Sequence, residues 1–432
     1  MKKNILKVST ALFIAVISAL LGVFISYHYL NSKLTYSAQS IQNSQELINK
    51  VIRVDDIFKN RYLGNLGETA LIDGMIKGYI EATGDKYACY IKKAGYKSYI
   101  KYVEEGTVNS AGLVAEPDGD GYLTVRTVIN GSPAYKARIY PGDVITKING
   151  SDVKETGELA SLGKLVIAEG TSIDVAWKRG TLSYSATLEY SDDYAPKSVS
   201  YRLYSDESEN LQSEGGGLSV LYIGIKYFGE TTPDEISAIL SEYYVNNMPI
   251  IIDLRNNYGG GVESLQRTAD IFIPAGILFN IDSTLDPETD DDATMPYYSD
   301  QAEIDSKITV IINEYTAREA EVFALIIKEF EKGEITGSRS AGIGSIQSYI
   351  DLGDETAVVL TTRAYRMPKG SKFDGAGITP DVETNASVSF ERLTLGEDEA
   401  LVAALESAGL HYSEPVPEPI EDEAHEGGGE VK

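Results

Sequence analysis

The 432-residue sequence has few of the residues that build disulfide, zinc and histidine-dependent sites. It contains one cysteine, Cys89, which excludes an intrachain disulfide and a cysteine-rich zinc site. Its three histidines, His28, His411 and His425, all lie near the ends of the chain. A Ser-His-Asp triad in the middle of the chain therefore has no histidine, and the same shortage disfavours a catalytic transition metal. We expect neither a metal nor another cofactor.

Positive charge is also scarce. The sequence has 38 lysines and arginines against 65 aspartates and glutamates, which gives a net charge of -27. Proteins that bind nucleic acid need clustered basic residues to neutralise phosphates, so this balance argues against a nucleic-acid partner. The acids are scattered, apart from Asp290-Asp291-Asp292 and the C-terminal tail, which indicates a solvated acidic surface.

A long uncharged run begins close to the N-terminus. Three lysines within the first seven residues precede 25 uncharged residues, 8–32. Because a membrane-spanning helix needs about 20 apolar residues, the run predicts a transmembrane signal-anchor over residues 1–33. The lysines place this end in the cytoplasm, so we expect the later residues outside the membrane. A signal peptide cleaved near Ser37-Ala38-Gln39 is the alternative, although signal peptides usually have shorter apolar cores of about 7–15 residues.

The rest of the chain divides by pattern into four regions. Residues 34–108 are expected to be helical, with apolar residues at three- and four-residue steps. Residues 109–192 change to short strands separated by glycine turns, and residues 195–408 alternate strands with helices. Residues 412–432 are rich in Pro, Glu and Gly and are expected to be disordered. The sequence therefore predicts a multi-domain α/β (α+β) protein.

Apolar runs and helix start signals locate the elements of the third region. Continuous apolar runs predict strands whose two faces are both covered. The predicted strands are 220–225, 250–252, 308–312 and 358–360, and the predicted helices are 233–244 and 317–332.

The second region closely resembles a PDZ domain. The resemblance rests on Gly131-Ser132-Pro133-Ala134 followed by the run PGDVITKING at 141–150, with Arg138 in place of a usual glycine. Such a domain is a small β-sandwich or barrel that pairs an extended peptide with a sheet edge and holds its terminal carboxylate on backbone N–H groups. A purely structural β-domain is the alternative. The peptide-binding residues that the resemblance implies are Ala111, Gly112, Leu113 and Val114.

Residues 66–408 as a whole resemble the carboxyl-terminal processing peptidases, the S41 serine peptidases that contain a PDZ domain. The run IIDLRNNYGGG at 251–261 resembles their strand and glycine turn, and AGITPD at 376–381 resembles their closing turn. The resemblance implies a ClpP/crotonase-like α/β protease core. In that family a serine is the nucleophile and a lysine is the base, with a glutamine one helical turn beyond the lysine.

Both reactive positions hold other residues in this chain. The nucleophile of the family lies in a run such as SASASE, and here TAREAE at 316–321 places Arg318 in its position. The base lies in a turn of the form GKG..Q, and here GIGSIQ at 342–347 places Ile343 in the lysine position and retains Gln347. Isoleucine cannot accept a proton, and arginine stays protonated with a pKa above about 12. We therefore expect no intact catalytic residues.

Several local roles remain open at this site. The N–H groups of Gly259 and Gly260 can form an oxyanion hole that binds a carbonyl or carboxylate. Arg318 can pair with a bound carboxylate or with a local acid such as Glu319 or Glu321. A relocated dyad would have to use neighbouring hydroxyl groups and lysines, namely Thr316, Ser340, Ser345, Lys328 and Lys332.

These residues predict a membrane-anchored pseudoprotease in a bacterial envelope. It would bind peptide or protein C-termini and act on a related active protease as a scaffold or regulator. In the resembled family the PDZ domain gates the site, so a binding switch is also expected. Two alternatives stay open: an active tail-specific serine endopeptidase with a relocated nucleophile, and a purely structural envelope protein.

Overall fold

Continuously apolar strands form the centre of the α/β domain, residues 199–412. In the computed structural model, strands β10 (Ser219–Ile225), β11 (Ile250–Asp253) and β14 (Ile308–Ile312) pair in parallel. All five residues of β14 are buried, as expected of a strand covered on both faces. The strand predictions made from these three apolar runs are therefore confirmed.

Three further strands complete this six-stranded sheet, whose order is β18-β15-β14-β11-β10-β8. Strands β15 (Gly333–Gly337) and β18 (Val382–Glu383) are parallel to their neighbours, and β8 (Val199–Ser205) is an antiparallel edge strand. Because β10, β11, β14 and β15 run in one direction, their carboxyl ends meet at one edge, where open α/β sheets bind ligands.

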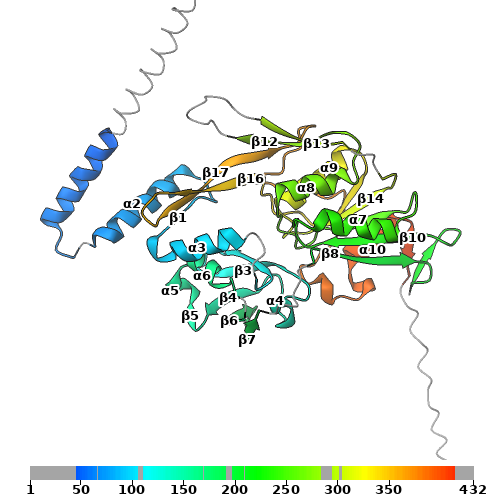
Figure 1. The fold of residues 1–432 in the computed structure, drawn as a ribbon, viewed down its shortest axis with the longest axis horizontal. Helices are drawn as coiled ribbons and strands as arrows, with labels where there is room; N and C mark the ends of the chain where they lie inside the picture. The colour runs from blue at the N-terminus through cyan, green and yellow to red at the C-terminus, as the bar shows by residue number, and fades with distance from the viewer. Residues whose placement is uncertain are drawn as a thin grey trace, which may run out of the picture. The chain divides into compact units, whose positions relative to one another are not determined.

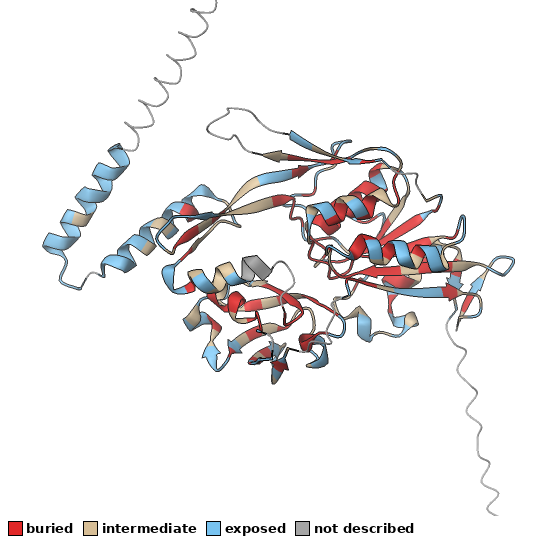
Figure 2. Cartoon of the chain, in the orientation of Figure 1, coloured by how far each residue is buried: buried red, intermediate tan, exposed pale blue. Residues whose placement is uncertain are grey.

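Helices cover both faces of this sheet (Figure 1). One face packs on α7 (Thr232–Tyr243), α8 (Val262–Asp270) and α9 (Glu319–Glu329), and the other packs on α10 (Glu399–Ser407). Along β11, Ile250 and Ile252 join the first helices while Ile251 faces α10. Figure 2 shows α9 buried along nearly its whole length. The helix predicted at 317–332 begins later, at Glu319, because Arg318 lies outside the helical φ range, and it ends at Glu329, shortly before Glu331 with its φ of +59°.

A second, antiparallel sheet was largely missed by the sequence analysis. Its order is β1-β17-β12-β13, with β16 also paired to β17. Strand β1 (Cys89–Ile91) comes from the segment predicted to be helical and pairs with β17, so that prediction is wrong at this point. Strand β17 (Ala357–Arg366) is longer than the predicted 358–360. The other members are β12 (Gly276–Ser283), β13 (Thr294–Ser299) and β16 (Ser345–Asp351).

The β domain, residues 110–190, contains a six-stranded antiparallel sheet around its own apolar core. The order is β2-β3-β4-β6-β7, with β5 paired to β4. Leu113, Ile145 and Trp177 are buried in this core. Its strands are β2 (Leu113–Pro117), β3 (Leu123–Val128), β4 (Val144–Ile148), β5 (Ser151–Asp152), β6 (Ser172–Arg179) and β7 (Leu182–Glu189), and its helices are α4 (Pro133–Lys136), α5 (Val153–Thr156) and α6 (Glu158–Lys164).

The structure describes residues 45–413, apart from 66, 106–109, 169, 191–196, 209, 284–293 and 301–303. The chain divides into two compact units, Met1–Met75 and Ile76–Lys432, and the site lies in the second. Among the described residues no helix is long and apolar enough to cross a membrane. The predicted anchor, the acidic run near Asp290 and most of the predicted tail lie outside the described residues. The remaining elements are a helix over 45–61, α2 (Glu68–Thr83), α3 (Lys93–Glu105), β9 (Leu211–Ser213), η1 (Phe390–Arg392), η2 (Leu395–Glu397) and β19 (Leu410–Tyr412).

Candidate active site

The candidate site forms where the turns after β11, β14 and β15 meet. These turns carry Gly259 with Gly260, Arg318, and Ile343, respectively. The amide N–H of Ala317 donates to the carbonyl of Asn257 over 3.0 Å, and the amide of Ala341 donates to Thr316, also over 3.0 Å. The structure therefore brings together the two positions that the sequence analysis assigned to the nucleophile and the base.

The backbone of Arg318 is strained. Its φ of 56° and ψ of -121° lie in a region that non-glycine residues rarely occupy, and it directly precedes α9. Such strain persists only where surrounding contacts enforce it, and it projects a side chain sharply from a strand-to-helix turn. This is the backbone shape that an exposed nucleophile requires, although the side chain here is arginine.

Glu321 holds the turns of Arg318 and Ile343 in register. Its fully buried carboxylate accepts hydrogen bonds from the N–H groups of Arg318 (3.1 Å), Gly342 (2.7 Å) and Ile343 (2.8 Å), and from the Ser340 hydroxyl. Burial raises the pKa of Glu321, and these hydrogen bonds oppose that rise. Glu321 is therefore a structural acid and not a free partner for the Arg318 side chain.

The Arg318 side chain crosses to the β domain. Its Nη1 donates to Oε1 of Gln347 over 2.9 Å, its Nη2 lies 3.7 Å from the Glu116 carboxylate on β2, and its guanidinium lies over the Tyr258 ring at 5.4 Å. Burial lowers the pKa of Arg318, but Tyr258, Glu116 and Glu319 outweigh it, and the pKa lies above its ordinary value. Arg318 was expected to pair with a local acid, but its ion pair is with Glu116, which is distant in sequence. Gln347 lies on strand β16 and not one helical turn beyond Ile343.

Ile343 has an apolar role. It is 7% exposed and packs with Val114, Tyr258 and Ala317 in a small cluster. Val114 belongs to the β domain, so this cluster joins the two domains beside Arg318. The position assigned to the base therefore contributes packing between domains and offers no proton acceptor.

Both amides of the glycine turn are occupied by the chain itself. The N–H of Gly259 donates to Oδ1 of Asn257 over 2.9 Å, and the N–H of Gly260 donates to Oε2 of Glu319 over 2.8 Å. The other Glu319 oxygen accepts a 2.5 Å hydrogen bond from Tyr365. A side chain at Gly259, whose φ is +101°, would collide with the Glu319 carboxylate. The predicted oxyanion-hole amides are therefore not available to a ligand in this structure.

Of the predicted peptide-binding residues, Ala111 and Gly112 lie in the turn before β2, and Leu113 and Val114 begin the strand. Ala111, Leu113 and Val114 are buried hydrophobic residues. The carbonyl of Ala111 accepts from Ala134 and that of Gly112 accepts from Ile129, which fixes the turn. Gly112 has a φ of +75°, which explains the glycine. Val114 contacts the Ile343 cluster, and Thr127 on β3 donates a 2.5 Å hydrogen bond to the Asn256 carbonyl. This edge of the β domain thus faces the candidate site.

Comparisons with known proteins agree with this geometry. The model of peptidase family S41 matches residues 219–384, which include Arg318 and Ile343. A probable CtpA-like serine protease of Staphylococcus saprophyticus is 29% identical over 332 residues, which cover 76% of this chain. A probable CtpA-like serine protease of Staphylococcus aureus is 28% identical over 379 residues, or 87% of this chain. Residues 219–384 are therefore an S41 peptidase domain, and these matches support the S41 carboxyl-terminal processing peptidases as the family of the chain.

The fold agrees with this S41 membership. The solved structure of the photosystem II D1 C-terminal processing protease matches with a TM-score of 0.57 and 22% identity, over 79% of this chain and 89% of that protein. The matched region spans 62% of the length of the S. saprophyticus relative and 71% of the S. aureus relative.

No relocated dyad is assembled among the described residues of this S41 chain. The buried hydroxyl of Thr316 donates to Leu254 over 2.8 Å and accepts from the Asn313 amide. Ser340 donates to Glu321 and accepts from the Ile378 amide, and Ser345 accepts from Gln347 over 3.1 Å. The lysines point elsewhere: Lys328 pairs with Asp381 at 2.6 Å and Lys332 donates to the Ile304 carbonyl.

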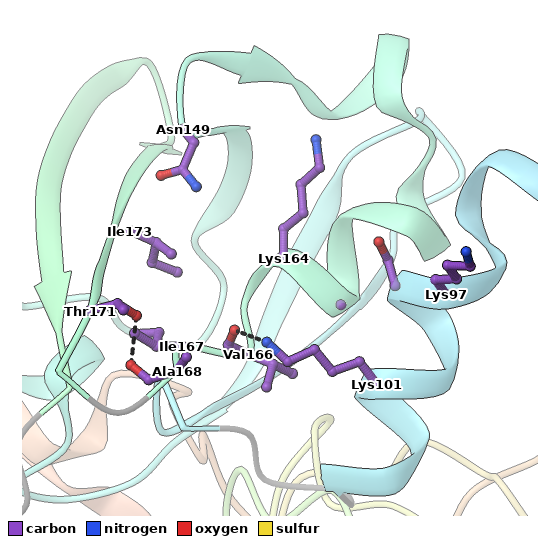
Figure 3. A pocket seen from close by; sticks show the side chains of 11 residues that line it. Lys97, Lys101, Asn149, Lys164, Val166, Ile167, Ala168, Thr171 and Ile173 are labelled. Atoms are coloured by element: carbon purple, nitrogen blue, oxygen red, sulfur yellow. Dashed lines mark hydrogen bonds between the residues drawn. The ribbon is translucent and has the colours of Figure 1, made fainter.

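A separate pocket of about 440 Å³ lies between α3 and the segment after α6 (Figure 3). Lys101 reaches across it from α3 to the carbonyl of Val166 over 3.0 Å. Lys164 donates to Thr156, and Lys97 pairs with Glu355 at 3.5 Å. The lysines of this pocket are thus bound to protein groups, and the pocket is lined by neither Arg318 nor Ile343.

The sequence analysis missed Glu116, Tyr258 and Tyr365 of the site, and it missed the contact of Glu319 with Gly260. Glu319 carried a visible signal, because it replaces a small residue of the family pattern next to the nucleophile position. Glu116 is an acid in an otherwise apolar strand, two residues after the predicted peptide-binding residues. Its partner on the other domain could not be read from the pattern.

Proposed function

We propose that this chain is a catalytically inactive S41 homologue that binds peptide or protein C-termini. In this proposal the β domain is a PDZ domain that uses Ala111, Gly112, Leu113 and Val114, and residues 1–33 anchor the chain in the membrane with its domains outside the cytoplasm. The observation that supports inactivity most is the Arg318 guanidinium at the strained turn before α9, next to an apolar Ile343. A charged arginine cannot attack a carbonyl, and isoleucine cannot take its proton.

The contacts around the glycine turn support the same proposal. Catalysis of acyl transfer needs N–H donors aimed at the developing oxyanion. Here the Gly260 donor is taken by the Glu319 carboxylate, which would also repel a developing negative charge. A scaffold or regulator of a related active protease would need the shape of the site but not this chemistry.

Turnover of a quenched, unstructured peptide library ending in small apolar residues tests the proposal. The full-length chain in mild detergent is compared with Arg318→Ser/Ile343→Lys and with Arg318→Ser/Ile343→Lys/Glu319→Ala. We expect no turnover by the natural chain, little by the double variant because Glu319 still occupies Gly260, and measurable turnover by the triple variant.

The matched control is Arg318→Ala/Ile343→Lys/Glu319→Ala, which lacks any nucleophile at position 318 and reports contaminating proteases. Turnover by the natural chain above this control would overturn inactivity and favour the active endopeptidase. Thermal melts of each variant exclude misfolding as the cause of a negative result. If the natural chain bound no peptide with a free C-terminus, the structural envelope protein would be favoured.

A further inference from the structure

Three donors from two domains surround the Glu116 carboxylate. The hydroxyl of Tyr258 donates a hydrogen bond to Oε2, Nη2 of Arg318 lies 3.7 Å from Oε1, and Nε of Arg126 lies 3.8 Å from Oε2. Arginine forks combined with a hydroxyl donor are a common way for proteins to recognise a carboxylate. The position assigned to the lost nucleophile therefore belongs to a carboxylate-binding arrangement.

The half of this arrangement on the α/β domain is pre-formed. Tyr258 is 6% exposed and follows the buried Asn257 in the glycine turn. The Arg318 guanidinium is fixed by the 2.9 Å hydrogen bond to Gln347 and by the Tyr258 ring, and its backbone is fixed by Glu321. Donors that are held in place before binding lose little conformational freedom when a ligand arrives.

Glu116 fits this arrangement incompletely. Only the Tyr258 contact is a hydrogen bond, since 3.7 and 3.8 Å exceed the usual N–H···O range of about 2.7–3.2 Å. The buried Nε of Arg126 has no hydrogen-bond partner among the described residues. A carboxylate that approached without the constraint of the β2 backbone could accept from Tyr258 and from Arg318 at the same time.

We propose that Tyr258 and Arg318 form a receptor for the terminal carboxylate of a peptide, and that Glu116 is its internal competitor. This inference rests on the proposed function and adds a second carboxylate site to it, whose donors are side chains of the α/β domain and not the backbone N–H groups of residues 111–114. A ligand at this receptor displaces Glu116. The apparent affinity of the ligand is therefore lowered by the fraction of molecules in which Glu116 occupies the receptor. Because Glu116 lies on β2, occupation of the receptor also releases one contact between the two domains.

Peptide titration by fluorescence anisotropy tests this receptor in the full-length chain. The probes are one labelled, unstructured peptide ending in small apolar residues, with either a free or an amidated C-terminus. We expect Glu116→Gln to bind the free-acid peptide about tenfold more tightly, and Arg318→Met to bind it about tenfold more weakly. A loss of this size matches a charged hydrogen bond of about 1.4 kcal/mol, which is a factor of ten in Kd.

Combined variants separate this receptor from the β domain itself. In the Arg318→Met/Tyr258→Phe background the gain from Glu116→Gln should disappear, because both donors that Glu116 competes for are then absent. Tyr258→Phe should weaken the free-acid peptide several-fold, Arg318→Lys should weaken it less than Arg318→Met, and Glu383→Gln is the control for loss of an exposed acid. The amidated peptide should be indifferent to all of them.

Two outcomes would overturn the receptor. One is a Glu116→Gln gain that persists with Arg318→Met/Tyr258→Phe or is equal for the amidated peptide, which would make Glu116 a direct part of the β-domain groove. The other is no change with either variant, which would make the contact a link between domains only. A photo-crosslinker at the peptide C-terminus distinguishes the sites: labelling of 111–114 alone would leave the proposed function intact without the receptor. Peptide cleavage during the titration would instead contradict the proposed function.

Discussion

The buried polar residues around the site and the two reactive positions differ: the former still support the turns of the site, whereas the latter carry no reactive side chain. Glu321, Thr316 and Asn313 are fully buried, and each makes several hydrogen bonds that hold the turns after β11, β14 and β15. Arg318 and Ile343 sit on those same turns and carry side chains that cannot perform acyl transfer. The strained backbone at position 318 is therefore present with side chains that offer neither a nucleophile nor a base at these two positions.

This difference indicates that the backbone shape of the site does not depend on a reactive side chain at position 318. A buried acid that is left without partners costs several kcal/mol, so the chain has a folding reason to keep Glu321 satisfied whatever occupies position 318. The reactive positions have instead been joined to the β domain, Arg318 through Glu116 and Ile343 through Val114. Both replacements thus serve contact between domains.

Breaking the framework is expected to give the largest effect. Each Glu321 oxygen accepts from a backbone N–H, so Glu321→Gln must point its amide N–H groups at donors in either orientation. Two donors are left unsatisfied at about 1–3 kcal/mol each, and we expect a loss of about 2–6 kcal/mol in the free energy of unfolding. Urea unfolding of Glu321→Gln beside the natural chain measures this loss.

The pH dependence of that loss has a defined sign. Burial raises the folded-state pKa of Glu321 above its unfolded value, so its contribution to stability is full below about pH 4 and falls as pH rises through the folded pKa. The difference in the free energy of unfolding between the natural chain and Glu321→Gln should therefore narrow from pH 4 toward pH 7. A gap that widened instead would mean that the hydrogen bonds outweigh burial in the folded protein.

Truncating Ile343, the position assigned to the base, should lower the free energy of unfolding by less than the Glu321 change does. Ile343→Ala removes apolar contacts with Val114, Tyr258 and Ala317. Buried Ile→Ala changes cost about 2–5 kcal/mol, and we expect about 2 kcal/mol because this cluster is small and lies where two domains meet. Ile343→Val is the matched control, at about 0.5–1 kcal/mol. In a cycle with Val114→Ala the two losses should be non-additive by at least about 0.5 kcal/mol, and strict additivity would show that Ile343 does not join the domains.

Much of the framework could be predicted from the sequence because its signals are local. The apolar runs at 250–252 and 308–312 located the central strands, and the two family patterns located Arg318 and Ile343 25 residues apart. Strands β13 and β16 were missed because their residues are only partly buried and alternate weakly. Strand β12 was also missed, although its residues 278–281 are buried.

Contacts between distant segments could not be predicted. Glu116 and Arg318 are about 200 residues apart in sequence, and nothing in either local pattern indicates that they meet. The occupation of Gly260 by Glu319 was closer to prediction, since the acid stands beside the nucleophile position. The orientation of the Glu319 carboxylate still depends on a hydrogen bond from the Tyr365 hydroxyl. Tyr365 lies on β17, a strand that the sequence analysis predicted too short.

The smallest effect concerns a second strained arginine outside the site. Arg138 has a φ of +57°, almost the same as the +56° of Arg318, at a position where the resembled PDZ pattern has glycine. The hydrogen bonds recorded for Arg138 are made by its backbone, to Tyr135 and from Arg179, so they survive substitution. We expect Arg138→Gly to stabilise the chain by about 0.5–1 kcal/mol, since glycine removes the left-handed strain and loses some of that gain to backbone entropy. Thermal melting measures it. A loss of stability would show that side-chain contacts hold Arg138 in its left-handed conformation, as they hold Arg318.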